Sequence, residues 1–436
     1  MFKTLSNALK VKEIRNGLLF TFFILIVLRL GSLIPVPGLD TARVADYMNS
    51  ALGASGFVNS ITGGSFAQMT IFALGVTPYI TSSIMVQLLT IAIPALEDMS
   101  KDGEDGRKKL NTITRYGTIL LALIESIGLT VGFSRNGYLT VDGILGYLLI
   151  IFTLTAGSTF VMWLGEKITV YGVGNGISII LLINITSRMP GDFYNLYLLF
   201  MKGQDMVKMI IAAAIIAAVV IVTVVLVVLL QDGIRKIPVQ YAQKVQGRKL
   251  MGGQSSHIPL KVNTSGVIPI IFASSILSVP QIVMNLFGKK PSGVWEDIFN
   301  GMNSNYWFNP DYPWASIGVI AYILLVFFFA YFYTSVTFNP MEIANNMKRG
   351  GGFIPGIRPG KPTQDYLNKI LNYIVFIGSV FLIIVAIIPI FFSGMFKANV
   401  SFGGTSLIII VGVVVDTIKQ IESKMIVRNY SGFLND

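Results

Sequence analysis

Residues 207–230 read VKMIIAAAIIAAVVIVTVVLVVLL, and Lys208 is the only charged side chain among them. As a helix rising about 1.5 Å per residue, this run is long enough to cross the roughly 30 Å of hydrocarbon in a bilayer. Similar apolar runs lie on both sides of it. With it, they cover residues 18–34, 75–93, 116–133, 144–164, 177–189, 207–230, 266–287, 317–337, 370–390 and 405–421. The sequence therefore predicts an all-α, polytopic membrane protein with ten transmembrane helices.

The composition argues against most other classes of protein. Of the 436 residues, 53% are hydrophobic and 13% are charged, whereas soluble domains carry about 25% charged residues. Because the chain has no cysteine, disulfides, iron–sulfur clusters, zinc–thiolate sites and cysteine nucleophiles are excluded. The single histidine, His257, leaves no two-histidine metal site. No metal or cofactor is predicted.

The placement of charge predicts how the chain is oriented. The net charge is +11, and with a cytoplasmic N-terminus the inner connections carry roughly three times as many Lys and Arg as the outer ones, as the positive-inside rule requires. The predicted parts are a cytoplasmic segment 1–17, a five-helix half 18–190, an outer connection 191–205, a second five-helix half 206–421 and a cytoplasmic tail 422–436. Because five is odd, the halves would be inverted relative to each other around a central pore.

Three connections between spans are unusual. The outer one contains residues 57–69 (FVNSITGGSFAQM), an amphipathic segment too short to span, which predicts a half-helix dipping into the membrane or a simple re-entrant loop. The inner connections 231–265 and 339–369 interleave Lys and Arg with Gly and Pro. This pattern is typical of ordered, protruding loops, although the bases also serve to orient the chain.

The residues inside the spans argue against two rival functions. A secondary transporter usually has ionisable groups at depth, but here few lie away from the span ends. They are Arg29, Glu125 and Asp416, and their roles are open. A membrane-embedded enzyme would need a serine or aspartate mechanism, and the sequence has no intramembrane aspartate pair or Gly-x-Ser-x-Gly elbow. The run Gly172-Val-Gly-Asn-Gly176 predicts a tight turn, because no strand precedes it as a phosphate-binding loop requires.

Short segments spread along the chain carry a resemblance. They are GVTPYI (75–80), RYGT (115–118), WLGE (163–166), GNGISII (174–180), GVIP (266–269), FNP (338–340), FIPGIRPG (353–360) and FGGTS (402–406). In this order and on a ten-span layout, they resemble the SecY family, the pore-forming subunits of protein translocases. Glu125 departs from the family's usual pattern, which has a neutral residue there.

The resemblance implies a channel without catalytic activity that passes unfolded polypeptides across the bacterial plasma membrane and releases membrane helices sideways into lipid. It implies a multi-pass protein with both termini in the cytoplasm. The implied partners are the small subunits SecE and SecG, the SecA motor ATPase, the ribosome with its RNA, and the polypeptide substrate.

The resemblance also implies site residues. An apolar ring that closes the pore comprises Val76, Ile80, Ile177, Leu181, Ile271 and Ile409. A plug over the outer side of this ring comprises residues 57–69, with Ile61, Gly63, Gly64, Ser65, Phe66 and Met69 as its key positions. A lateral gate between spans two and three and spans seven and eight includes Thr81, Ser82, Ser83, Gln87, Ser274 and Ser275. The docking surface for motor and ribosome includes Arg235, Lys236, Arg248, Lys249 and Arg358.

Overall fold

The computed structural model describes residues 9–51, 56–141, 143–202, 205–241, 244–246, 249–251, 255–287, 293–303, 306–309, 313–396 and 404–432. Every predicted span falls on a helix, so the prediction of an α-helical architecture is confirmed. These helices are α2 (Lys12–Gly31), α5 (Thr77–Ala92), α7 (Gly103–Arg135), α8 (Ile144–Tyr171), α9 (Gly176–Phe200), α10 (Met206–Asp232), α11 (Ile268–Phe287), α13 (Ile317–Thr337), α15 (Lys361–Phe396) and α16 (Gly404–Gly432).

Several of these helices continue beyond their apolar runs. α7 and α15 begin well before the predicted inner borders of their spans, and α9 passes through Pro190 to end at Phe200. The predicted span ended at residue 189, one residue before this proline, and the helix continues past it although proline usually interrupts a helix. Most of the predicted outer connection 191–205 is therefore helical.

Some helices are apolar enough to cross a membrane by themselves. In the described part of the chain six helices meet this condition, and α5 with α6 (Pro94–Lys101), bent by 105°, makes a seventh. α9 and α16 do not meet it, and α11 contributes only the shorter apolar stretch Ile268–Leu277. The count of ten crossings therefore stays a prediction.

The connection between α2 and α5, predicted to face outward, folds back into the helix bundle. It contains α3 (Thr41–Ala51) and α4 (Gly56–Ile61), and turns follow as far as residue 76. The predicted half-helix 57–69 is thus too long, because Gly63 and Gly64 both take left-handed φ values, +67° and +90°, which end a helix. A short bridge joins Pro35 to Thr70 and ties the returning segment to the end of α2.

The two long connections that were predicted to face inward form one unit containing strands, which the sequence analysis did not predict. β1 (Ile234–Tyr241) pairs antiparallel with β4 (Ser255–Lys261) on one side and with β5 (Gly352–Phe353) on the other. β2 (Lys244–Gln246) and β3 (Lys249–Met251), which follow β1 and precede β4 in the sequence, form a separate two-stranded ribbon. α14 (Pro340–Arg349) precedes β5 in the second connection. Loops 231–265 and 339–369 therefore meet in a single sheet.

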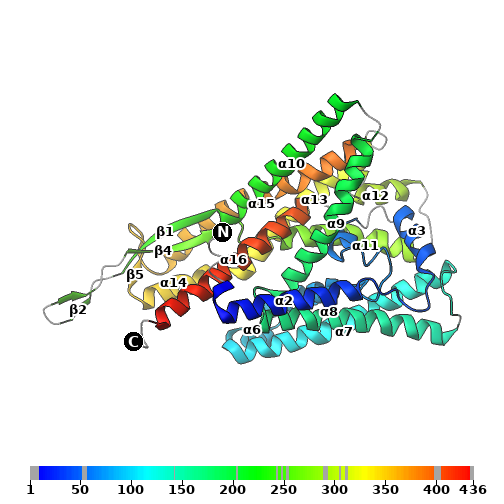
Figure 1. Ribbon diagram of the computed structural model, residues 1–436. Helices are drawn as coiled ribbons and strands as arrows, with labels where there is room; N and C mark the ends of the chain where they lie inside the picture. The colour runs from blue at the N-terminus through cyan, green and yellow to red at the C-terminus, as the bar shows by residue number, and fades with distance from the viewer. Residues whose placement is uncertain are drawn as a thin grey trace.

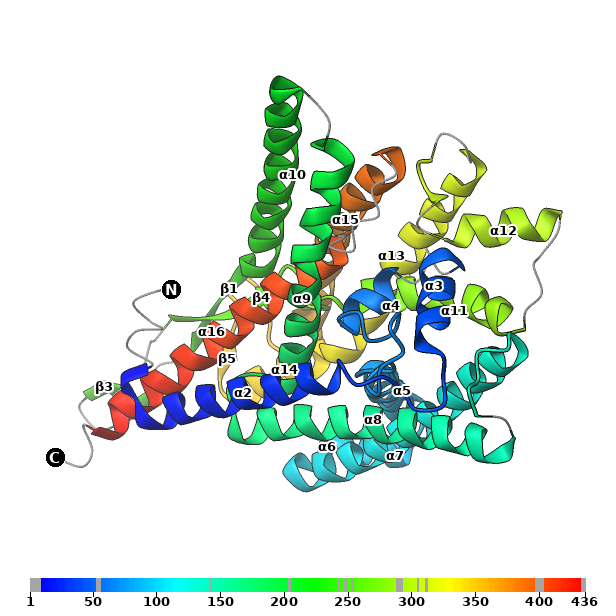
Figure 2. The same cartoon turned by 45° about the vertical axis from the view of Figure 1, so that its right-hand side comes forward.

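The sheet, the start of α2 and the end of α16 lie at the same end of the bundle (Figures 1 and 2). At this end Ile14 of α2, Val173 of the α8–α9 turn and Ile421 of α16 share one apolar cluster. The opposite end carries α3, α12 (Val294–Met302) and the 3-10 turn η3 (Pro313–Ser316). Between these ends α4 packs against α9, α16 against α9, and α11 against α7. The first and second predicted halves thus contact each other along α9 and α7.

Candidate functional site

One apolar cluster at the centre of the bundle contains all the predicted ring positions. Val76, Leu181 and Ile409 are buried in it, and Ile80, Ile177 and Ile271 pack against it partly exposed. They come from the start of α5, the start of α9, α11 and α16. The structure therefore brings together side chains from four helices and from both halves of the chain.

Glycines hold α9 close enough for its residues to enter this cluster. A Cβ built on Gly176 would lie 1.9 Å from the carbonyl oxygen of Gly165 on α8, so no larger residue fits there. The tight turn predicted before Gly176 is confirmed, with Gly174 at φ +80°. Asn175 caps α9 by accepting a hydrogen bond from the Ser178 N–H at 3.2 Å. This turn fixes where Ile177 begins its helix.

The plug segment is anchored to both halves of the chain. The amide of Asn184 on α9 donates to the Ile61 carbonyl at 3.0 Å, and the Ser60 and Ser406 hydroxyls lie 3.2 Å apart, both buried. Ile61 itself belongs to the same cluster as the ring positions. One apolar side chain, Ile61, therefore packs the end of α4 into the cluster that holds the predicted ring positions, and two polar contacts join it to α9 and α16.

The rest of the plug packs elsewhere. Phe66 and Met69 are buried in a different cluster, with side chains of α7 and α8, and do not join the cluster that holds the ring. Ser65 is buried, and a Cβ on Gly63 would lie 3.1 Å from both Arg29 Nη1 and the Asn184 Cα, whereas Gly64 has open space. Of the predicted plug side chains, only Ile61 belongs to the ring cluster.

The predicted gate residues divide into two kinds. Ser82 is buried and its hydroxyl donates to the Thr114 carbonyl of α7 at 2.8 Å, while Ser274 on α11 lies next to Tyr322 of α13. The first contact joins α5 to α7 and the second joins α11 to α13, so neither contact crosses the predicted gate. Thr81 donates to the carbonyl of Thr77 in its own helix. The remaining predicted positions are at least partly exposed: Ser83, Gln87 and Ser275.

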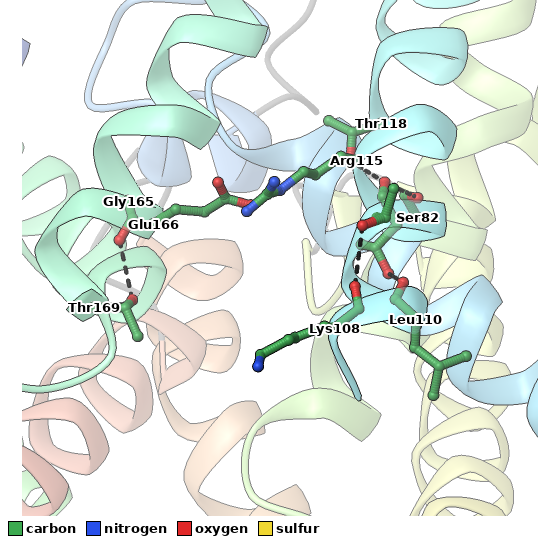
Figure 3. Close-up of polar contacts among 10 residues, drawn as sticks. Ser82, Lys108, Leu110, Arg115, Thr118, Gly165, Glu166 and Thr169 are labelled. Carbon is green, nitrogen blue, oxygen red and sulfur yellow. Dashed lines mark hydrogen bonds and ion pairs between the residues drawn. The ribbon is translucent and has the colours of Figure 1, made fainter. Parts of the chain in front are cut away.

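An ion pair joins α7 and α8 beside the predicted gate. Arg115 Nε donates to Glu166 Oε1 at 2.6 Å, and Figure 3 shows the two side chains pointing toward each other from separate helices. Next to Glu166, Lys167 lies over the rings of Trp163 and Tyr171 at 5.5 and 5.4 Å from the ring centroids. Aromatic rings and a lysine at a helix end are typical of a membrane interface.

The charges predicted to lie within spans have different surroundings. Asp416 is exposed and pairs with Lys261 of β4 at 3.8 Å, so it belongs to the end of the bundle that carries the sheet and not to the interior of a span. Glu125 is partly buried on α7. Arg29 points toward the plug, since its Nη1 atom lies next to Gly63.

The predicted docking residues lie on the sheet and the loop beside it. Arg235 and Lys236 are exposed on β1, and Arg358 is exposed in the loop before α15, where its carbonyl accepts a hydrogen bond from the Thr363 hydroxyl at 2.9 Å. Lys249 is on β3. Arg248 lies outside the described residues.

Sequence reasoning missed the residues that seat the plug. Asn184, Ser60 and Ser406 are polar residues in or beside apolar segments, a signal that was present in the sequence. A buried polar group inside a membrane protein needs a partner. The partner of each one could not be named without the tertiary structure.

Comparison with known proteins identifies the family. The sequence matches the SecY family over residues 70–418. The chain belongs to the SecY family. It is 44% identical to the SecY protein translocase subunit of Halalkalibacterium halodurans, covering 100% of both chains. Two solved structures of SecY-type channels align with 95% of this chain and with 94% of their own chains. One, of a SecY channel whose plug domain is described as stabilising the closed state, has a TM-score of 0.63 at 19% identity. The other, canine Sec61 in a ribosome–channel complex, has a TM-score of 0.60 at 18% identity. The chain is therefore a multi-pass membrane protein with the SecY fold.

Proposed function

We propose that this protein is the channel subunit of a protein translocase and passes unfolded polypeptides across a membrane. The observation that carries this proposal is the single apolar cluster that holds Ile61 together with every predicted ring position. A pore for any sequence must close without offering specific hydrogen-bond partners, and a constriction of aliphatic side chains closes by excluding water. The plug is seated on this constriction by contacts that a moving polypeptide can displace.

The same proposal covers location, release and partners. The protein would lie in the bacterial plasma membrane with both termini and the sheet in the cytoplasm, because the basic connections face inward. Membrane helices would leave between α7 and α11, which contact each other across the predicted gate. The protein would have no catalytic activity, so the energy would come from SecA or from the ribosome. SecE and SecG would pack against its exposed apolar helices.

The pathway is tested by disulfide capture, for which the absence of native cysteine is an advantage. Cysteines are introduced separately as Ile80→Cys and, on the exposed surface of α15, as Ile384→Cys. A secretory chain with one cysteine is stalled during export and then oxidised. An adduct with Ile80→Cys alone is the expected result. Continued export with no adduct at Ile80→Cys would place the pathway elsewhere, and export that does not need this protein would support the transporter alternative.

Charge reversal tests the docking surface. We expect Arg358→Glu to weaken SecA binding by about tenfold or more. The new carboxylate would face the acidic groups that a basic docking surface attracts, and like charges facing across an interface cost several kcal/mol. Arg349→Glu on α14 is the matched control, since this arginine is also exposed. The measurement is SecA affinity for the reconstituted complex, followed by export. Equal losses for both variants would show that only the general positive charge of this end matters.

A further inference from the structure

Arg29 is placed where a cation is costly and where the channel must seal. It lies in the last turn of α2, and its Nη1 atom is buried without a hydrogen-bond partner among the described residues. The Cβ position of Gly63 in the plug is 3.1 Å from this atom and equally far from the Cα of Asn184 on α9. We propose that Arg29 is the residue that excludes cations at the seat of the plug. This inference rests on the proposed channel function.

The uncompensated charge follows from the surroundings. No carboxylate forms an ion pair with Arg29 in the described part of the chain. The other arginine with a buried, unpartnered Nη1 is Arg188, which is one turn beyond Asn184 on α9. Asp192 lies close enough to Arg188 to offset its charge. Arg29 therefore supplies the larger net positive field beside the plug.

An aliphatic ring alone does not distinguish ions by sign. It closes by excluding water, so any gap that admits water admits cations and anions alike. A guanidinium next to that gap repels cations, and its buried Nη1 atom is the part of the charge that solvent screens least. Arg29 thus gives the seal a preference that side chains such as Ile61 and Ile409 cannot supply.

The test measures ion selectivity in the complete complex, reconstituted in planar bilayers. All channels carry Phe66→Ala, which loosens the plug in a cluster that does not include Arg29. Reversal potentials in a KCl gradient give the ratio of chloride to potassium permeability. We expect chloride to be preferred with Arg29 and with Arg29→Lys. The preference should be lost in Arg29→Gln and reversed in Arg29→Glu.

The matched control is Arg43→Gln, because Arg43 is also outside the ring but is exposed and paired with Asp40 at 3.3 Å. It should leave the ratio unchanged. An equal ratio in Arg29→Gln, Arg29→Glu and the parent would overturn the proposal. If the Phe66→Ala channel exports secretory chains but its ion selectivity does not depend on Arg29, only this inference fails. If the parent neither exports nor conducts, the channel function itself fails.

Discussion

Replacing Gly157 by valine is expected to leave little folded protein. Gly157 is buried on α8, and a Cβ at this position would lie 1.8 Å from the carbonyl oxygen of Ile71. Because the obstructing atom belongs to the backbone, it cannot rotate away as a side chain would. Overpacking a core usually costs about 1–3 kcal/mol, and this contact should lie at or above the upper end.

The damage should reach the plug as well as α8. Ile71 donates its N–H to the Ile34 carbonyl, and the Ser158 hydroxyl donates to the Gly75 carbonyl at 3.0 Å. These bonds hold the segment that leads from the plug to α5. Displacing it would move Val76 out of the apolar cluster.

Thermal unfolding and the yield of folded, detergent-solubilised protein measure this effect. Gly191→Val is the matched control, because Gly191 is also helical and a Cβ added to it would have no atom within 4 Å. Both variants replace glycine by a β-branched residue in a helix. Equal melting temperatures for the two variants would contradict the close packing of α8 against Ile71.

Replacing Gly63 by valine is expected to leave the protein folded but leaky. Gly63 has a φ of +67°, which costs an L-residue about 1–2 kcal/mol. Its Cβ would also press on the backbone of Asn184 at 3.1 Å. The plug can relieve both by leaving its seat, and the ring then closes the pore alone. The measurement is ion flux into liposomes that contain the complex without substrate.

Gly64→Val separates backbone strain from contact at the seat. Gly64 has a φ of +90°, yet nothing lies within 4 Å of its Cβ position. This variant carries the conformational cost without the collision, so we expect a smaller leak than from Gly63→Val. If the two variants leak equally, the fit of Gly63 against α9 does not hold the plug closed.

Much of the helical framework could be predicted from local sequence. Every apolar run became a helix because the interior of a bilayer offers backbone groups no other partner. Glycine placement predicted the turn at Gly174, where φ is +80°. The same local reasoning failed for the plug, since its helix ends at Ile61 and not at residue 69. It also missed the strands of the inner connections, because β1 is completed by β5 from a distant loop.

The sequence by itself determined that the long apolar segments are helical, and the family to which the chain belongs. These properties depend on residues that are near each other in the chain and on the solvent around them. The family resemblance named the six ring positions, but only the tertiary structure showed that they share one apolar cluster and which residues hold the plug. Ser60 and Ser406 are 346 positions apart, and Arg29 reaches the plug from another helix. Such contacts depend on how whole helices pack together, and no local pattern specifies them.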